Sequence, residues 1–258
     1  MTVKVAAVIP ARMSSSRFPG KPLLQVQGLP MIEHVRRRTL RCGRFTDVVV
    51  ATCDREIAEA VQRLGGRALM TSPSHPGASD RVAEAMRQLD CTHVVNVQGD
   101  EILVLPEDLQ RLVSAIEAEP GLPAWNAVAR IEEEAELTDR SIVKGVVSAS
   151  GRVLYCARDL SHVGAGRESG FEPARKILGI LAYRREFLER YLTLPRTPLE
   201  IAGSIDQLRI IEHDVALQGV EFSRGYLGIN EPHEVPLVQR YLREDARQQT
   251  VLQEILAQ

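Results

Sequence analysis

An apolar segment that runs directly into a basic, hydroxyl-rich loop limits what this chain can fold into. Residues 3–9 are mostly apolar, which predicts a buried parallel strand, and we expect it to stop at Pro10, which cannot donate to a sheet ladder. The loop that follows carries hydroxyl, guanidinium and ammonium groups and a flexible glycine, at Ser14, Ser15, Ser16, Arg12, Arg17, Lys21 and Gly20. Side chains and backbone N–H groups of such a loop can surround a polyphosphate. The alternative is a basic surface loop without a function.

The loop does not follow the two best known phosphate-binding patterns. A Walker A loop would require glycine where Ser15 stands, and serine or threonine where Pro22 stands. The dinucleotide fingerprint G-x-G-x-x-G is absent from the sequence. A polyphosphate bound here must therefore be bound in another way.

Composition indicates an ordinary globular protein. The 258 residues are 44% hydrophobic and 26% charged, with a formal net charge of −2, so nothing favours nucleic acid as a partner. No apolar run approaches the ~18 residues that span a bilayer, and the first residues do not form a secretory signal. We expect a cytoplasmic protein that binds no membrane. Its four cysteines lack C-x-x-C spacing, which favours reduced structural thiols over a metal or redox site.

Strands and helices alternate through the first half of the chain. Strands are predicted at 48–51, 67–70 and 93–97, and helices at 30–40, 55–64, 80–89 and 106–116. Ser79 is a possible helix cap, and Arg36, Arg37 and Arg38 are interpreted as a solvated helix face. This alternation predicts an α/β fold with a doubly wound, mostly parallel, Rossmann-like sheet.

The second half follows a different pattern. Strands are expected at 125–129, 142–147, 153–156, 177–183 and 220–226, and helices at 184–192, 206–217 and 232–246. The glycine-containing segment 163–170 is interpreted as a flap or a dimer-contact loop. Because no linker or repeat divides the chain, we predict one domain, 1–258, with an inserted lobe at 128–199.

A second polar motif, Gln98-Gly99-Asp100-Glu101, follows the predicted strand at 93–97. Ligands of open α/β sheets bind beyond the carboxyl ends of the strands, so this motif and the first loop should meet at one edge. A carboxylate there, facing a polyphosphate held by Arg12 and Lys21, is suited to hold Mg²⁺. The alternative is an aspartate that only caps a helix or a turn.

Several segments together resemble a known family. The pattern PAR-x-x-S-x-R-x-PGKPL resembles the signature loop of the sugar nucleotidyltransferases, and most closely that of the cytidylyltransferases that activate 3-deoxy-manno-octulosonate (Kdo). VNVQGDEI at 95–102 is similar to the family's VNVQGDEP, and the stretches at 77–81, 143–146, 154–158, 197–200 and 205–209 echo further family motifs in the same order.

The resemblance implies CMP transfer from CTP to an acidic acceptor, with release of pyrophosphate, Mg²⁺ as cofactor and a homodimer as the assembly. It implies catalytic roles for Arg12, Lys21 and Asp100, and no catalytic histidine. The nucleotide would contact Pro10, Ala11, Arg12, Ser15, Ser16, Lys21, Thr52 and Asp54. The acceptor would contact Arg81, Gln98, Tyr183, Asp206 and Gln207, and the metal ligands would be Asp100 and Asn230.

The sequence departs from the family at the acceptor end. Ile177 and Leu181 stand where the family has a histidine and a tyrosine, Gly203 stands where it has a glutamate, and Asn230 replaces its second metal-binding aspartate. Three hypotheses remain: CMP transfer to Kdo or a related sugar acid, the same transfer to a small phosphonate acid, or a catalytically silent relative. The sequence does not identify the acceptor.

Overall fold

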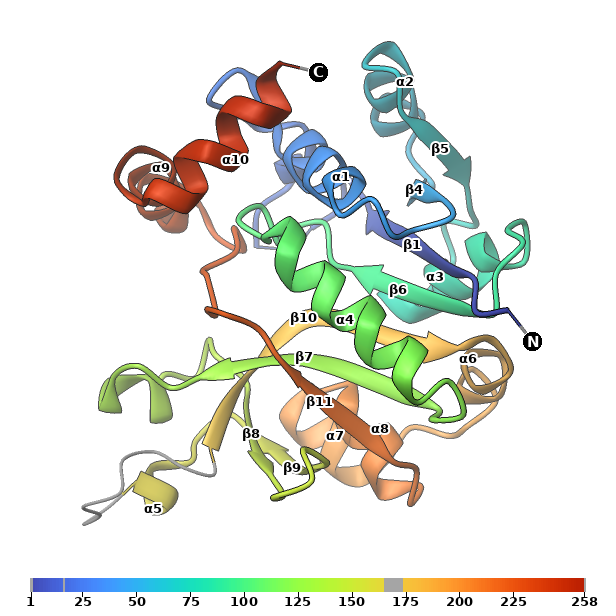
Figure 1. Cartoon of the computed structure of the whole chain (residues 1–258), viewed down its shortest axis with the longest axis vertical. Helices are drawn as coiled ribbons and strands as arrows, with labels where there is room; N and C mark the ends of the chain where they lie inside the picture. Colours follow the sequence, from blue (N-terminus) through green and yellow to red (C-terminus); the bar gives the residue numbers. More distant parts are fainter. Residues whose placement is uncertain (1, 16, 165–173, 258) are drawn as a thin grey trace. The chain divides into compact units, whose positions relative to one another are not determined.

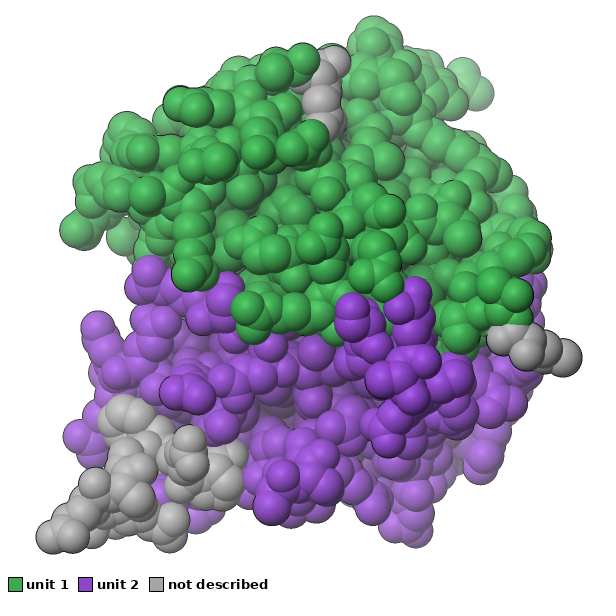
Figure 2. All heavy atoms as spheres, viewed as in Figure 1, with its two compact units in different colours: residues 1–113, 226–258 green, residues 114–225 purple. Residues whose placement is uncertain are grey.

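The computed structural model describes residues 2–15, 17–164 and 174–257 (Figure 1). The chain divides into two compact units, coloured separately in Figure 2: unit 1, Met1–Val113 with Tyr226–Gln258, and unit 2, Ser114–Gly225. The lobe predicted at 128–199 lies within unit 2, which begins earlier and ends later. Its larger extent follows from the pairing of β7 (Ala124–Arg130) with β11 (Leu217–Glu221), which brings both flanking segments into one sheet.

Unit 1 is built on four parallel strands in the order β6 (His93–Val97), β1 (Val5–Ala11), β4 (Val48–Thr52) and β5 (Arg67–Met70). The helices in its N-terminal part are α1 (Met31–Arg41), α2 (Arg55–Arg63), α3 (Ala78–Met86) and the first part of α4 (Pro106–Ala118). A short hairpin of β2 (Gln25–Val26) and β3 (Leu29–Pro30) precedes α1. The predicted α/β class and the mostly parallel sheet are confirmed.

Two predicted element ends in unit 1 are wrong. Strand β1 continues through Pro10 to Ala11, because β6 pairs with it only as far as Val8 and leaves Pro10 beside a single strand, β4. A proline is tolerated where one side of a strand has no partner. Ser79 does not cap a helix, because α3 already begins at Ala78 and Ser79 is buried in its first turn.

The arginine triplet of α1 is buried, not solvated. Arg36 and Arg37 both bind the carboxylate of Glu33, and the three guanidinium groups donate to backbone oxygens of three different segments: Leu64, Ile255 and Val104. The prediction failed because neighbours surround α1, including α10 (Ala246–Leu256), which lies beside it in Figure 1. The triplet therefore joins the pieces of unit 1.

Unit 2 contains a mixed sheet in the order β11, β7, β10 (Ala174–Arg184), β8 (Lys144–Val147) and β9 (Val153–Ala157). Of the strand pairs between the described residues of this sheet, β11–β7 is parallel, and β7–β10, β10–β8 and β8–β9 are antiparallel. Its smaller elements are η2 (Glu134–Leu137), α5 (Ser161–Gly164), α6 (Arg185–Tyr191), α7 (Pro198–Gly203) and α8 (Gln207–Glu212). The helix predicted at 206–217 is too long, because Asp214 has a φ of 56° and β11 starts at Leu217.

The segment after β11 returns to unit 1 and forms η3 (Pro232–Glu234), α9 (Val235–Glu244) and α10. Asp245 separates the two helices, and its side chain accepts hydrogen bonds from the N–H groups of Arg247 and Gln248, so α10 is a new, capped helix. The predicted flap at 163–170 lies mostly outside the described residues. No described helix is both long and apolar enough to cross a membrane.

Candidate active site

The loop after β1 is fixed at both of its ends. The N–H of Met13 donates to Asp54 Oδ2 at 2.8 Å, and the N–H of Gly20 donates to the carbonyl of Met13 at 3.0 Å. Gly20 has a φ of 77°, a conformation that other residues adopt only with strain. The loop thereby returns to its starting point, and Lys21 begins the short helix η1 (Lys21–Leu23).

The two polar motifs meet, as the sequence predicts. Lys21 Nζ lies 2.9 Å from Asp100 Oδ2 and also 2.9 Å from the carbonyl oxygen of Ile229. The Lys21 and Asp100 side chains retain 14% and 18% of their exposure, so the pair is partly desolvated yet still reachable. A third segment, around residue 229, joins them, and all three belong to unit 1.

Two glycines allow the three backbones to approach. A Cβ atom on Gly99 would lie 2.9 Å from the carbonyl oxygen of Pro10, and one on Gly228 would lie 2.8 Å from that of Asp100. Real Cβ atoms essentially never come this close to a backbone atom. Glycine at both positions is therefore a condition for the convergence, a role that the sequence patterns did not predict.

The remaining nucleotide-side residues divide into exposed and supporting groups. Arg12 is exposed, Ser15 is half-buried, and Ser16 lies outside the described residues. Thr52 is buried and its hydroxyl accepts from the N–H of Asp54, whose carboxylate holds Met13. The side chains of Thr52 and Asp54 thus shape the loop, while Pro10 and Ala11 form the end of β1.

Two oxygen-bearing side chains are available to a metal ion. Lys21 is the one side-chain partner of Asp100 among the described residues, which leaves Oδ1 open. Asn230 Oδ1 lies 3.4 Å from Arg17 Nη2, a weak contact. No group of three or more His, Cys, Asp or Glu within the described ranges could hold a metal by itself. A hard cation here would need further oxygens, such as those of a bound phosphate chain.

The predicted acceptor residues lie in both units. In unit 1, Gln98 follows β6, and Arg81 is a buried residue of α3 whose guanidinium donates to the hydroxyl of Thr71. In unit 2, Asp206 is exposed and precedes α8, and Gln207 is its first residue. Tyr183 is fully buried, with its ring 6.4 Å from that of Phe187 and 6.0 Å from that of Tyr191.

Ionisable groups away from the site have structural roles. Burial lowers the pKa of His34 to about 4, and its Nε2 lies 2.6 Å from the carbonyl oxygen of Val26, so the ring is neutral and holds the β2–β3 hairpin. Burial raises the pKa of the Cys156 thiol to about 12, and none of the four cysteines forms a disulfide, as expected for structural thiols.

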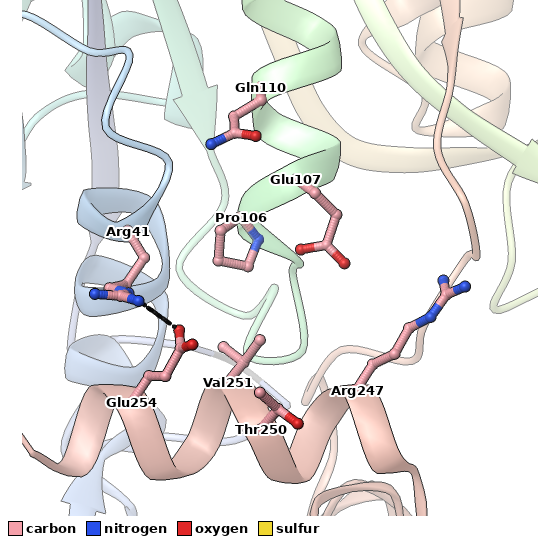
Figure 3. Close-up of a pocket in the computed structure, with 8 residues that line it drawn as sticks. All are labelled: Arg41, Pro106, Glu107, Gln110, Arg247, Thr250, Val251 and Glu254. Carbon is pink, nitrogen blue, oxygen red and sulfur yellow. Dashed lines mark hydrogen bonds and ion pairs between the residues drawn. The ribbon is translucent and has the colours of Figure 1, made fainter.

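One surface pocket of unit 1, with a volume of about 360 Å³, lies between α1, α4 and α10 (Figure 3). An ion pair of 2.8 Å between Arg41 and Glu254 forms one side, and Glu107 and Arg247 also line it. None of the predicted site residues lines this pocket, so it is separate from the Lys21–Asp100 site.

Comparison with known proteins identifies the family. A family model described as cytidylyltransferase matches residues 6–220. The chain belongs to the cytidylyltransferase family. The 3-deoxy-manno-octulosonate cytidylyltransferase of Geobacter metallireducens is 35% identical over 251 residues, which cover 92% of this chain and 96% of that protein. The protein of the same name from Paramagnetospirillum magneticum is 39% identical over 245 residues, with coverages of 92% and 96%.

A solved structure gives the same result for this cytidylyltransferase. CMP:2-keto-3-deoxy-manno-octonic acid synthetase, determined in complex with CTP, is 35% identical and superposes with a TM-score of 0.86, covering 94% of this chain and 99% of that one. The predicted resemblance to the Kdo-activating cytidylyltransferases, the nucleotidyltransferase-type fold and the prediction of an enzyme are confirmed. The alternative of a catalytically silent relative is not favoured.

Proposed function

We propose that this cytidylyltransferase transfers CMP from CTP to an acidic acceptor, a sugar acid of the Kdo kind, with release of pyrophosphate and with Mg²⁺ as cofactor. The observation that carries the proposal is the 2.9 Å Lys21–Asp100 pair at the carboxyl ends of neighbouring parallel strands. It combines a cation for phosphate with a carboxylate for a metal ion, and the Kdo-named relatives support the choice of acceptor.

The phosphate chain would lie along the loop that follows β1. Arg12 is exposed and Lys21 is within reach of Asp100, so both can bind the β- and γ-phosphates and offset the charge that develops on pyrophosphate as it leaves. Backbone N–H groups of the loop would add further donors. We assign the preference for cytosine to backbone groups near Ala11 and at 52–54, because the Thr52 and Asp54 side chains are used to hold the loop.

The residues present fit a magnesium ion that arrives with the nucleotide. Asp100 would offer its carboxylate and Asn230 its amide oxygen, and oxygens of the nucleotide's phosphates and of water would be the further ligands that a hard cation needs. When bound, Mg²⁺ would supply positive charge that offsets the charge of the phosphates. Because Asn230 is neutral, this chain binds the metal with one negative charge fewer than a pair of aspartates would supply.

The acceptor needs orientation more than deprotonation. An ionised acid or a polarised hydroxyl would attack the α-phosphorus in line with the departing pyrophosphate, and Gln98, Arg81, Asp206 and Gln207 are the residues that we assign to contact it. Tyr183 is fully buried against Phe187 and Tyr191, so we do not assign its side chain to the acceptor. Ile177 and Leu181 have aliphatic side chains, 8% and 3% exposed, and can therefore offer a bound acceptor no hydrogen bonds. A polyhydroxylated acid would then lose roughly 1–3 kcal/mol for each hydroxyl left unpaired, which makes the choice of acid a sharp test.

Pyrophosphate release tests the function directly. The purified chain is mixed with CTP, UTP, ATP or GTP, with and without Mg²⁺, and with Kdo, its 8-amino analogue or phosphonoacetate. We expect turnover with CTP, Mg²⁺ and Kdo, and loss of turnover after chelation by EDTA. Turnover with phosphonoacetate and not with Kdo would replace the sugar acid by the small phosphonate of the second hypothesis. Absence of pyrophosphate from every mixture would contradict the proposed function.

We also propose that the working assembly is a homodimer, which the family resemblance supports. Light scattering of the purified chain measures the molar mass. A mass near that of a single 28.6 kDa chain across micromolar concentrations would contradict it.

A further inference from the structure

A buried amide of unit 2, Asn126 on β7, uses all of its hydrogen-bonding groups in three directions. It is fully buried in a strand whose other buried residues, Ala124, Trp125 and 127–129, are apolar. Its Nδ2 donates to the carbonyl oxygens of Ala127 at 2.7 Å and Leu178 at 3.0 Å, and its Oδ1 accepts from Gln207 Nε2 at 2.9 Å. Since both carbonyls can only accept and Nε2 can only donate, the orientation of the Asn126 amide is fixed.

The contact of Asn126 with the Leu178 carbonyl lies at an irregularity in the sheet. In the antiparallel pair of β7 and β10, Asn126 and Val128 face Leu181 and Ile177, so the single residue Ala127 stands opposite three residues, 178–180. Such a bulge leaves backbone groups outside the regular ladder. Asn126 satisfies one of them, the Leu178 carbonyl, and so holds the bulge of β10 in place.

The contact with Asn126 Oδ1 holds Gln207, one of the residues assigned to the acceptor. Its Nε2 is bound to Asn126, whereas its Oε1 has no hydrogen-bond partner in the part of the chain that the structure describes. Gln207 Oε1 is not among the fully buried side-chain atoms without a partner, and solvent can therefore reach it. One end of the carboxamide is thus fixed in the core, and the other is left as a hydrogen-bond acceptor.

We propose that Asn126 is a positioning residue that orients Gln207 so that Gln207 Oε1 accepts a hydrogen bond from a hydroxyl of the acceptor acid. This inference rests on the proposed function, because it takes Gln207 as an acceptor contact. It adds which atom of Gln207 is used and what chemical group it recognises. A carboxylate or a fully ionised phosphonate has no hydrogen to give to Oε1, so the arrangement favours a hydroxylated acid over a small polyanion.

Kinetics of single and double variants test the coupling, with Kdo as the acceptor. We expect Asn126→Ala to raise the KM for Kdo about tenfold while the KM for CTP stays within about twofold, because only the acceptor contact is displaced. Gln207→Ala should have a similar effect, and the double variant should be no worse than Gln207→Ala alone. Val220→Ala on the neighbouring strand β11 is the matched control, since it removes buried apolar volume without touching an amide.

A second measurement does not depend on turnover. Side-chain amide resonances of Gln207, assigned from Gln207→Ala, should shift in Asn126→Ala and stay in place in Val220→Ala. Asn126→Ser replaces Asn126→Ala if the latter does not fold. Equal KM values for Kdo in wild type and variant, additive effects in the double variant, or unshifted Gln207 resonances would overturn the inference. If the wild-type protein failed to use Kdo while the Gln207 resonances still shifted in Asn126→Ala, the proposed acceptor would be contradicted and the Asn126–Gln207 link would remain supported.

Discussion

The two units carry their candidate site residues in opposite ways. In unit 1, charged side chains at loop positions after parallel strands stay partly exposed, as Lys21 and Asp100 do, and close backbone approaches at Gly99 and Gly228 hold them together. In unit 2, Gln207 and Tyr183 are buried on regular elements and are fixed by a neighbouring amide or by aromatic rings.

This difference follows from the groups that each unit is proposed to bind. A triphosphate carries charge whatever nucleoside it belongs to, so unit 1 needs cations and carboxylates that water can still reach. An acceptor acid is distinguished by where its hydroxyls lie, and that requires polar groups held in one orientation. Changes at the Lys21–Asp100 site should therefore affect the rate of every transfer, and changes at Gln207 or at the polar groups that hold it should affect the acceptor or the stability.

The largest effect should come from removing the carboxylate of unit 1. We expect Asp100→Asn to lower kcat/KM in the pyrophosphate assay about 1,000-fold, because the amide can neither pair with Lys21 nor offer a charge to a metal ion. Asp90→Asn, a surface aspartate paired with Lys4, is the control and should be near wild type. A loss of less than tenfold for Asp100→Asn would show that the charge of this pair is not what unit 1 contributes.

The stability of unit 1 should be sensitive to acid through His34, which holds the β2–β3 hairpin. Burial lowers the pKa of His34 from 6.5 to about 4, so between these values the unfolded chain takes up a proton that the folded chain refuses. The contribution of neutral His34 to the free energy of unfolding is fully present above pH 6.5. The free energy of unfolding should fall by about 3 kcal/mol as the pH drops from 6.5 to 4. Urea unfolding across this range measures it.

His34→Gln isolates that proton. Glutamine can donate to the Val26 carbonyl but does not titrate. Between pH 6.5 and 4, the free energy of unfolding of His34→Gln should therefore fall by about 3 kcal/mol less than that of the wild type. Gln253→Ala, at an exposed position without a titratable group, should keep the wild-type slope. Identical slopes for wild type and His34→Gln would mean that His34 is not held neutral.

Close backbone approach in unit 1 should be nearly as important as charge. A Cβ on Gly228 would meet the Asp100 carbonyl oxygen at 2.8 Å, so Gly228→Ala must displace the backbone that carries the carboxylate. We expect kcat/KM to fall about 100-fold, since small misplacements of catalytic groups cost this much. Gly121→Ala, where a Cβ would meet nothing within 4 Å, is the matched control. Equal activity of the two variants would contradict the packing argument.

The smallest effect should come from a buried carboxylate of unit 2, Glu200, and should lower the free energy of unfolding. Burial raises the pKa of Glu200, but hydrogen bonds from Arg209, Arg196 and the Thr197 N–H outweigh burial, so the pKa lies below its ordinary value. Glu200→Gln should lower the free energy of unfolding by about 2 kcal/mol, measured by urea denaturation.

Glu189→Gln is the control for this change, because its contact with Arg185 is long and exposed and should contribute little. If Glu200→Gln instead abolished turnover without loss of stability, the division between a charged site in unit 1 and a structural network in unit 2 would be wrong.

Sequence reasoning succeeded where local pattern and chain order decide the outcome. The apolar strands of unit 1, the Gly20–Lys21 loop and the motif at 98–101 were located from residue type and spacing alone. Their meeting also follows from sequence, because the carboxyl ends of parallel strands share one edge of a sheet. Family motifs further extended the prediction to cytidylyl transfer, which the comparisons confirm.

What the sequence left undecided depends on contacts between distant residues. An arginine triplet on a helix looks solvated until α2, α10 and the segment at 104 supply carbonyl oxygens for it. A lone asparagine in an apolar strand shows no role until β10 bulges and Gln207 lies beside it. Hydrophobic periodicity reports which face of an element is apolar, but only tertiary structure determines which polar groups are buried together. The charges of the Lys21–Asp100 site were therefore predictable from sequence, whereas the buried arginines of α1 and the amide network of unit 2 were not.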